Sequence, residues 1–217
     1  MSLARQLAER VTTMRYQDLP PPAVHWSKVA VLDTVGVALA GAGEDAPKRV
    51  EETLELRPGG GPSLIFGSNR RTGALDAALI NGVAAHALDF DNTAKNLGGH
   101  VSAVMVPALI AAGEAYGASG RDLILAHAAG YEVGASMGRC VNPRHSEKGW
   151  HPTATLGVLA VTAACAKLLK LTGQAQAIPS VIAFVFQYST ARETPSARFR
   201  IVDRASQTAL VKQRRTP

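Results

Sequence analysis

Apolar residues recur at intervals of three and four along most of the chain, the spacing that places side chains on one face of a helix. The pattern predicts helices over residues 3–11, 23–39, 48–56, 75–90, 104–118, 121–138 and 152–169. Clusters of proline and glycine separate these segments, and both residue types are unfavourable in helix interiors. The chain is therefore expected to be an all-α helical bundle.

Two of these segments carry a stripe of large apolar residues on one side, as a helix packed on a core would. The stripes consist of Val29, Leu32, Gly36 and Leu39 in one segment, and of Leu75, Leu79, Val83, His86 and Phe90 in the other. Because His86 lies on an apolar stripe, a core-facing, hydrogen-bonded histidine is the structural alternative to a role in a site. Asp89 and Thr93 would share one rim of this helix if it stayed regular up to the break at Gly98.

Small residues within the helices predict close packing between them. Five glycines interrupt two alanine-rich segments, although glycine lowers helix propensity. They are Gly113, Gly117, Gly130, Gly134 and Gly138. Ahead of the second of these segments, Ser119 and Asp122 resemble a capping box with Asp in place of Glu.

Composition and charge exclude several classes of protein. The 217 residues are 47% hydrophobic and 18% charged, which is ordinary for a globular protein, and two cysteines exclude a disulfide scaffold or a four-cysteine metal site. The net charge of +6 is carried mainly by residues 174–217, with 7 basic against 2 acidic residues, whereas residues 1–173 have 16 against 15. A basic tail of this kind is usually solvated, so no nucleic-acid partner is expected.

The N-terminus and the apolar stretches predict a cytoplasmic protein without a membrane partner. Charges are mixed into the first ten residues, unlike the basic start and apolar run of a signal peptide. The longest uncharged apolar stretches, 101–113 and 152–166, are shorter than the roughly 20 residues that a membrane span needs.

Candidate chemistry gathers between residues 86 and 100. Two imidazoles, two carboxylates and a hydroxyl fall within these fifteen positions: His86, Asp89, Asp91, Thr93 and His100. Abstracting a proton next to a carboxylate needs a positioned base, which His100 or Asp89 would supply, and losing hydroxide needs an acid such as Thr93 or the second imidazole. The alternative for Asp89 and Asp91 is to cap or brace the turn before Gly98.

The same cluster permits a metal site as another class of function. His86, Asp89, Asp91 and His100 supply the nitrogen and oxygen ligands that metal hydrolases use. Their spacing matches no motif as specific as H-E-x-x-H, so neither a metal nor a cofactor is predicted.

A small polycarboxylate substrate would also need cationic partners. The candidates are Lys95, Arg144 and Lys148, the last two in a polar loop that ends at His151. The helix that starts at Pro152 would add backbone N–H groups toward an anion. Charges placed for solubility alone are the alternative for Arg144 and Lys148.

Six groups of motifs stand in order along residues 3–173: Asp18-Leu19-Pro20, Leu32 to Ala40, Asp76 to Gly82, Ala85 to Thr93, His100 to Ala103 and His151 to Gly157. Together they resemble the MmgE/PrpD family, whose members include 2-methylcitrate dehydratase, cis-aconitate decarboxylase and iminodisuccinate epimerase. The resemblance implies metal-free and cofactor-free chemistry on small polycarboxylates, a helical domain with a smaller α/β lid domain, and a homodimer. It also implies that Asp89, Thr93 and His100 line the active site, with His86 and His151 in adjoining motifs that bind substrate.

Residues 174–217 change in composition and show no match to the family motifs. We therefore predict an N-terminal MmgE/PrpD-like helical domain over 1–173, followed by a basic tail that is frameshifted or disordered, and no lid domain. The expected function is a 2-methylcitrate dehydratase-like lyase that eliminates water and is impaired by truncation. The alternative is a catalytically inactive fragment or helical interaction module, with a metal-dependent hydrolase third, so whether the chain is an enzyme stays open.

Overall fold

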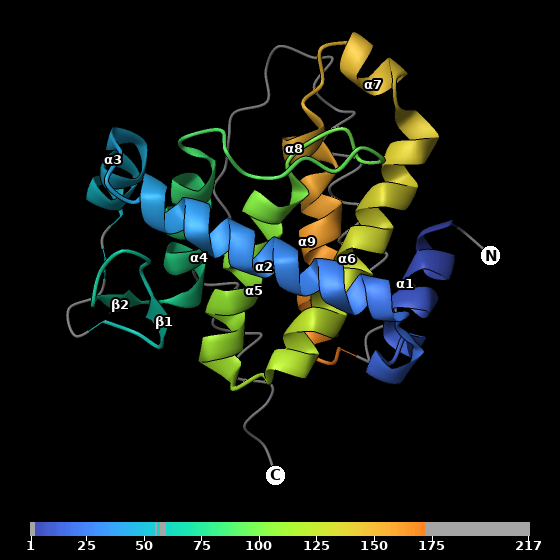
Figure 1. Ribbon diagram of the computed structural model, residues 1–217, viewed down its shortest axis with the longest axis horizontal. Helices are drawn as coiled ribbons and strands as arrows, with labels where there is room; N and C mark the ends of the chain where they lie inside the picture. The colour runs from blue at the N-terminus through green and yellow to red at the C-terminus, as the bar shows by residue number, and fades with distance from the viewer. Residues whose placement is uncertain (1–2, 55, 57–59, 172–217) are drawn as a thin grey trace. The chain divides into compact units, whose positions relative to one another are not determined.

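Helices make up almost all the regular structure in the computed structural model, which describes residues 3–54, 56 and 60–171 (Figure 1). The elements are α1 (Leu3–Thr13), the 3-10 helix η1 (Tyr16–Asp18), α2 (Pro21–Gly41), α3 (Asp45–Thr53), β1 (Ser63–Leu64), β2 (Arg71–Thr72), α4 (Ala74–His86), α5 (Val101–Tyr116), α6 (Gly120–Val141), α7 (Arg144–Glu147), α8 (Pro152–Thr155) and α9 (Gly157–Leu168). The prediction of an all-α fold is confirmed. The predicted tail, 174–217, lies outside the described residues.

The main core lies where α5, α6 and α9 meet, with α1 packed against it. Its largest fully buried side chains include Met105, Leu109 and Leu159. The long helix α2 lies across α4, α5 and α6, as Figure 1 shows. A small antiparallel pair, β1 with β2, packs beside α4 and α5 and is the only sheet within the described residues.

The predicted start of α6 is confirmed in detail. Asp122 N donates to Ser119 Oγ at 3.2 Å, and Ser119 N donates to Asp122 Oδ2 at 3.1 Å, which completes the capping box. The hydrogen bonds from Ser119 also hold the pKa of the Asp122 carboxyl below its ordinary value. The carboxylate form therefore stabilises the helix start.

Glycines on α6 allow the close helix packing that the sequence predicts. A Cβ at Gly130 would lie 2.5 Å from Met105 Sδ and 2.6 Å from the carbonyl oxygen of Ala160 on α9. Gly134 is similarly close to Leu97 and Ala160. No larger side chain fits at these contacts unless α9 moves away.

Replacing Gly130 with Ala is therefore expected to destabilise the protein by about 1–3 kcal/mol, the usual cost of overpacking a core. Gly36 on α2 offers the matched control, because a Cβ there meets no atom within 4 Å. Gly36→Ala should stabilise by up to about 1 kcal/mol through higher helix propensity. Urea unfolding of both variants checks the pair, and equal effects would contradict the packing account.

The large apolar stripes do not face the core. On α2, Leu32 is 75% exposed and Leu39 is 52% exposed, whereas Thr34 and Ala38 are buried. A Cβ at Gly41 would lie 2.1 Å from the carbonyl oxygen of Ala84 on α4. The physical reason is that small side chains bring α2 and α4 into close contact and leave the bulkier residues outside.

The prediction that the large apolar residues of 75–90 face the core is wrong for the same reason. Leu75 is 66% exposed and Leu79 is 50% exposed, while the buried residues of α4 are Ala77, Ile80, Asn81, Ala84 and Ala85. The helix also ends at His86, so Asp89 and Phe90 do not lie on it. His86 is therefore at a helix end and half-buried rather than in the core.

Among the described helices, α2 alone is long and apolar enough to cross a membrane by length and composition. Core helices of bundles and signal sequences share this length and composition. Helix α2 carries the polar, buried Ser27 and Thr34 and contacts α4, α5 and α6. These are the features of a helix packed in a bundle.

Candidate active site

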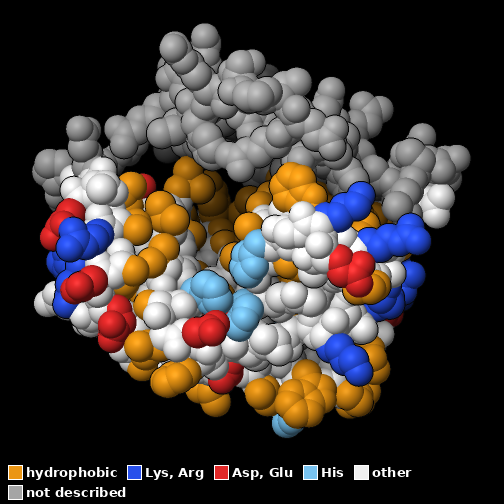
Figure 2. Space-filling model, turned by 90° about the horizontal axis from the view of Figure 1, so that it is seen from above, with side chains coloured by type: hydrophobic (Ala, Val, Ile, Leu, Met, Phe, Trp, Pro, Cys, Tyr) orange, Lys and Arg blue, Asp and Glu red, His pale blue; other side chains and the backbone are white. Residues whose placement is uncertain are grey.

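One buried carboxylate joins two imidazoles at the centre of the predicted cluster. Asp91 Oδ1 lies 2.9 Å from His86 Nδ1, and Asp91 Oδ2 lies 3.1 Å from His100 Nδ1. The Asp91 side chain has no exposed surface, whereas the His86 and His100 side chains are 38% and 19% exposed. The two rings are 4.8 Å apart between centroids. Figure 2 shows imidazoles gathered on one face beside acidic side chains.

This contact fixes which ring nitrogen of each neutral histidine carries its proton. An ionised carboxylate only accepts hydrogen bonds, so both imidazoles donate their Nδ1–H to Asp91. Each Nε2 of His86 and His100 then carries a lone pair. Two neighbouring rings thereby each offer a basic nitrogen that can accept a proton or bind a cation.

Two helix ends and a closed loop bring the imidazoles together. His86 is the last residue of α4, and His100 is the N-cap of α5. The intervening loop closes through a hydrogen bond from Ala94 N to the carbonyl oxygen of Gly99 at 2.9 Å. Thus residues fourteen positions apart in sequence reach the same carboxylate.

Helix α8 braces the same loop. His100 N donates to Thr153 Oγ1 at 2.9 Å. A Cβ at Gly99 would lie 2.7 Å from Thr153 Oγ1, so only glycine permits this approach. Thr153 therefore positions the backbone of His100 and accounts for the glycine at position 99.

Asp89 reaches the cluster through an uncommon backbone conformation. Its φ of +54° lies in the left-handed region, which non-glycine residues rarely adopt although Asp tolerates it better than most. Its Oδ1 lies 3.7 Å from His100 Nε2, and its side chain is 80% exposed. An observed outlier beside two imidazoles is the kind of local strain found at functional sites.

A second polar chain ties the loop to α2 and α5. Asn92 Nδ2 donates to Asp33 Oδ2 at 3.2 Å, and Ser102 Oγ donates to Asn92 Oδ1 at 2.9 Å. These bonds fix the residue that follows Asp91. The position of the Asp91 carboxylate is thus secured through its neighbour Asn92, which is bonded to both α2 and α5.

An apolar cavity of about 570 Å³ adjoins the cluster at His86 and Thr153. Its other walls come mainly from α4 and α5, with Val83 and Val104 among the lining residues. Figure 2 shows a hollow lined by hydrophobic side chains near the imidazoles. A cavity of this size and apolar lining is typical of a small-molecule site, and His86 is the member of the cluster that lines it.

The remaining predicted site residues are exposed and separate from this arrangement. Thr93 and Lys95 lie on the loop, Arg144 and Lys148 lie in or beside α7, and His151 precedes α8. Among the described residues, no hydrogen bond or ion pair joins any of these five side chains to the cluster. Their roles in binding or proton transfer stay predictions.

His145 makes two contacts within the polar segment after α6. The His145 ring stacks on Trp150 with centroids 6.0 Å apart, and its Nε2 lies 2.7 Å from Thr155 Oγ1. Burial lowers the pKa of His145 below its ordinary value, which favours the neutral ring in this stack. The stack leaves Arg144 and Lys148 pointing to solvent as exposed residues.

Sequence reasoning missed the roles of Asp91 and Thr153. Asp91 was considered only as a turn brace or a metal ligand, although a carboxylate between two histidines is the usual partner of an imidazole Nδ1–H. That signal was present in the spacing of His86, Asp91 and His100. Thr153 carried no such signal, because its contact with the loop depends on how α8 packs.

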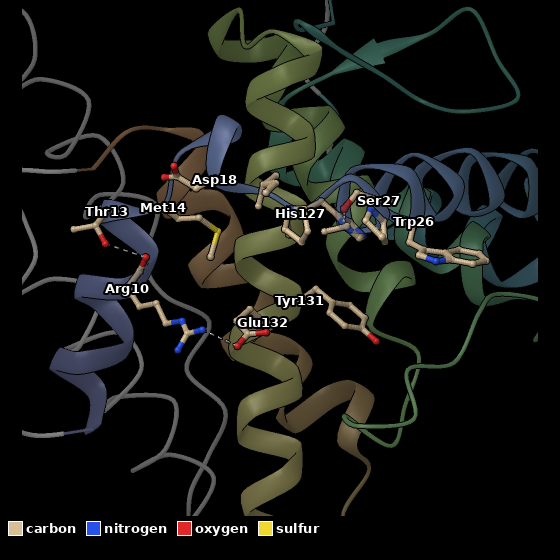
Figure 3. Close-up of a pocket in the computed structure, with 14 residues that line it drawn as sticks. Arg10, Thr13, Met14, Asp18, Trp26, Ser27, His127, Tyr131 and Glu132 are labelled. Carbon is tan, nitrogen blue, oxygen red and sulfur yellow. Dashed lines mark hydrogen bonds and ion pairs between the residues drawn. The ribbon is translucent and has the colours of Figure 1, made fainter.

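A second cavity, of about 770 Å³, lies between α1, η1, α2 and α6 and shares no lining residue with the first (Figure 3). His127 and Ser27 line it, with His127 Nδ1 3.1 Å from Ser27 Oγ. Burial lowers the pKa of His127 to about 4, so the ring is neutral near pH 7. His127 Nε2 is buried and has no hydrogen-bond partner among the described residues.

The sequence profile of the MmgE/PrpD N-terminal domain matches residues 5–208. The chain belongs to the MmgE/PrpD family. The matched range runs past residue 173, where the motifs recognised in the sequence end. The resemblance predicted from those motifs is thereby confirmed.

Several curated proteins of this kind are similar to the chain. Cis-aconitate decarboxylase of Mus musculus is 30% identical over 177 residues, which cover 79% of this chain and 36% of the relative. The cis-aconitate decarboxylase-like protein oryM of Aspergillus oryzae is 30% identical over 183 residues, covering 79% and 37%. Cis-aconitate decarboxylase of Aspergillus terreus is 28% identical over 176 residues, covering 77% and 35%. The chain spans little more than a third of the length of these relatives.

Proposed function

We propose that this chain carries the proton-transfer centre of a metal-free lyase that acts on a small polycarboxylate. The observation that carries the proposal is the buried Asp91 carboxylate, which holds two imidazoles and leaves both Nε2 atoms available. Membership of the MmgE/PrpD family and the similarity to cis-aconitate decarboxylases support the substrate class and the lyase chemistry.

The proposed centre serves either elimination of water or decarboxylation. In a dehydration, His100 Nε2 takes the proton from the carbon next to a carboxylate, and the C–O bond breaks as His86, in its protonated imidazolium form, gives its Nε2 proton to the departing hydroxyl, to which Thr93 donates a hydrogen bond. In a decarboxylation, the C–C bond to the carboxylate breaks, CO2 leaves, and protonated His100 delivers a proton to the remaining carbon. Asp91 stabilises the charged imidazolium in both reactions, which is the role of a positioning residue.

Binding of the substrate carboxylates is proposed for Lys95, Arg144, Lys148 and His151. Within the described residues, no Lys or Arg forms an ion pair with Asp89 or Asp91, so none of these cations is already engaged by the cluster. A bound anion would have to draw cationic side chains toward the imidazoles. The exposed positions of Arg144 and Lys148 beside α7 leave both free to move.

The purified chain should be tested with 2-methylcitrate, for the proposed dehydration, and with cis-aconitate, the substrate named for the relatives. Proton NMR of the reaction mixture distinguishes loss of water from loss of CO2. His100→Asn is the matched negative control, because it removes the proposed base and keeps a hydrogen-bonding side chain. Turnover that disappears in His100→Asn supports the proposal. Absence of turnover with both substrates from well-folded protein rejects it and favours a helical interaction module.

The exposed face of α2 favours an additional role in self-association, and we propose a cytoplasmic homodimer formed through it. Trp26 is 64% exposed and Leu32 is 75% exposed, and only 17% of the most apolar window of α2 is buried. Apolar surface of this extent on one helix commonly marks a protein interface.

Leu32→Asp is expected to convert a dimer to a monomer, because it places a charge within the apolar face. Leu75→Asp is the matched control, since Leu75 is 66% exposed but lies on α4. Light scattering coupled to size exclusion measures the mass of each variant. Dissociation by Leu75→Asp alone would place the interface elsewhere.

A further inference from the structure

We propose that His86, His100 and Asp89 form a binding site for a divalent transition metal, with zinc as the best-suited ion. One ligand atom from each of His86, Asp89, Asp91 and His100 lies within 4.8 Å of all the others. In this family member the ion is proposed as an inhibitor that competes with proton transfer, and not as a cofactor.

The hydrogen bonds to Asp91 prepare the two imidazoles for a metal. Histidine ligands commonly donate the N–H of one ring nitrogen to a carboxylate and bind the metal through the other nitrogen. Asp91 accepts at 2.9 Å from His86 and at 3.1 Å from His100, which leaves the Nε2 lone pairs as ligands. One carboxylate thus orients both nitrogen ligands.

Asp89 supplies the third ligand. Its Oδ1 is 3.7 Å from His100 Nε2, and zinc bonds of about 2.0–2.2 Å place neighbouring ligand atoms roughly 3.4 Å apart. The limit of 4.8 Å holds for ligand atoms of all four residues, Asp91 included, so the three ligands would have to move closer together around an ion. Asp89 is 80% exposed and can make most of this movement, while Asp91 stays fixed in the interior.

The donor set selects zinc over the common hard cations. Two imidazole nitrogens and one carboxylate suit Zn²⁺, whereas Mg²⁺ and Ca²⁺ prefer oxygen ligands. The carboxylates of Asp89 and Asp91 together balance the charge of a divalent ion. Three protein ligands would leave the fourth zinc position open to water or to a substrate carboxylate.

Inhibition by zinc rests on the proposed function, because the ion would occupy the same Nε2 atoms that accept protons. Binding itself does not depend on turnover. A direct binding measurement therefore separates the two proposals: zinc can bind to a chain that has no activity, and an active chain can fail to bind zinc.

Isothermal titration of untagged, metal-free protein with ZnCl2 tests the site, with MgCl2 titrated as the hard-cation control. We expect one zinc per chain and at least 100-fold weaker binding in His100→Asn and in His86→Asn. His25→Asn is the matched control, because it removes an exposed histidine on α2. Asp91→Asn should weaken zinc binding about 10–100-fold, as loss of a carboxylate behind a histidine ligand usually does.

Circular dichroism melts show whether each variant is folded, and Asp89→Asn gives a variant at an exposed position if a histidine variant unfolds. Zinc affinity that is unchanged in His86→Asn and His100→Asn would overturn the proposal. Equal losses in His25→Asn would overturn it as well, because binding would then not be local to the cluster. Magnesium binding of similar strength would exclude the proposed imidazole ligation.

Discussion

Replacing Asp91 with Asn is expected to lower turnover about 10²–10⁴-fold, the range over which positioned proton transfer usually contributes. The carboxylate accepts a hydrogen bond from each of two imidazoles. An amide presents one oxygen and one NH2 group, so it can accept from one ring and must donate to the other. The ring that receives the NH2 group has to move its own proton to Nε2 and loses its basic nitrogen there.

Nitrogen NMR of labelled histidine separates this positioning role from a general loss of structure. In the unchanged chain, His86 and His100 should both carry the proton on Nδ1 when neutral. In Asp91→Asn, one of the two rings should switch to protonated Nε2, while His25 keeps its signals. Turnover that survives the substitution, or two unchanged ring signals alongside lost turnover, would contradict the positioning role of Asp91.

Helix positions could be predicted from the sequence because they depend on local signals. The capping pair Ser119 and Asp122 marks the start of α6, and the glycines of that helix indicate its close packing with α9. Which face of a helix is buried depends on its neighbours. On α2 and α4 the small residues form the contact, so the large apolar stripes that dominate the sequence pattern lie outside.

The residues of the site could likewise be predicted from the sequence, but their arrangement in space could not. His86, Asp89 and His100 stand out because polar residues gather between apolar helices. Their geometry depends on the end of α4 at His86 and on the left-handed backbone at Asp89. No periodicity encodes either feature.

For the cationic residues, by contrast, the sequence offered only the residue type as a reason to predict a role in the site. Arg144 and Lys148 have the right charge for a polycarboxylate, but the stack of His145 on Trp150 sets the loop that carries them. His145 and Trp150 lie on either side of Lys148 in the sequence, and their stack is an apolar contact of a neutral ring, so the pattern of charges does not predict it. Substrate binding by these two residues therefore remains a proposal based on chemistry, whereas the bridge at Asp91 rests on contacts that the structure shows.

Acidification from pH 7 to pH 4 is expected to remove about 3 kcal/mol of stability through His127 alone. Burial lowers the pKa of this histidine to about 4 in the folded chain, against an ordinary value of 6.5. Between these two values the unfolded chain binds a proton that the folded chain does not bind. Stability is therefore highest above pH 6.5 and falls as the pH drops toward 4. This loss is a large share of the roughly 5–15 kcal/mol that stabilises a typical domain.

Urea unfolding at a series of pH values measures this effect against His127→Gln, which keeps a neutral, hydrogen-bonding side chain near Ser27 at every pH. The variant should lose about 3 kcal/mol less than the unchanged chain over the same range, whatever its stability at pH 7. Other groups, such as Asp122 at the start of α6, contribute equally to both proteins and cancel in the comparison. His25→Asn should keep the full acid sensitivity, because His127 is unchanged in that variant. Parallel pH profiles for the unchanged chain and His127→Gln would mean that His127 is protonated in the folded chain at no cost in stability. That result would contradict the account in which burial keeps this ring neutral.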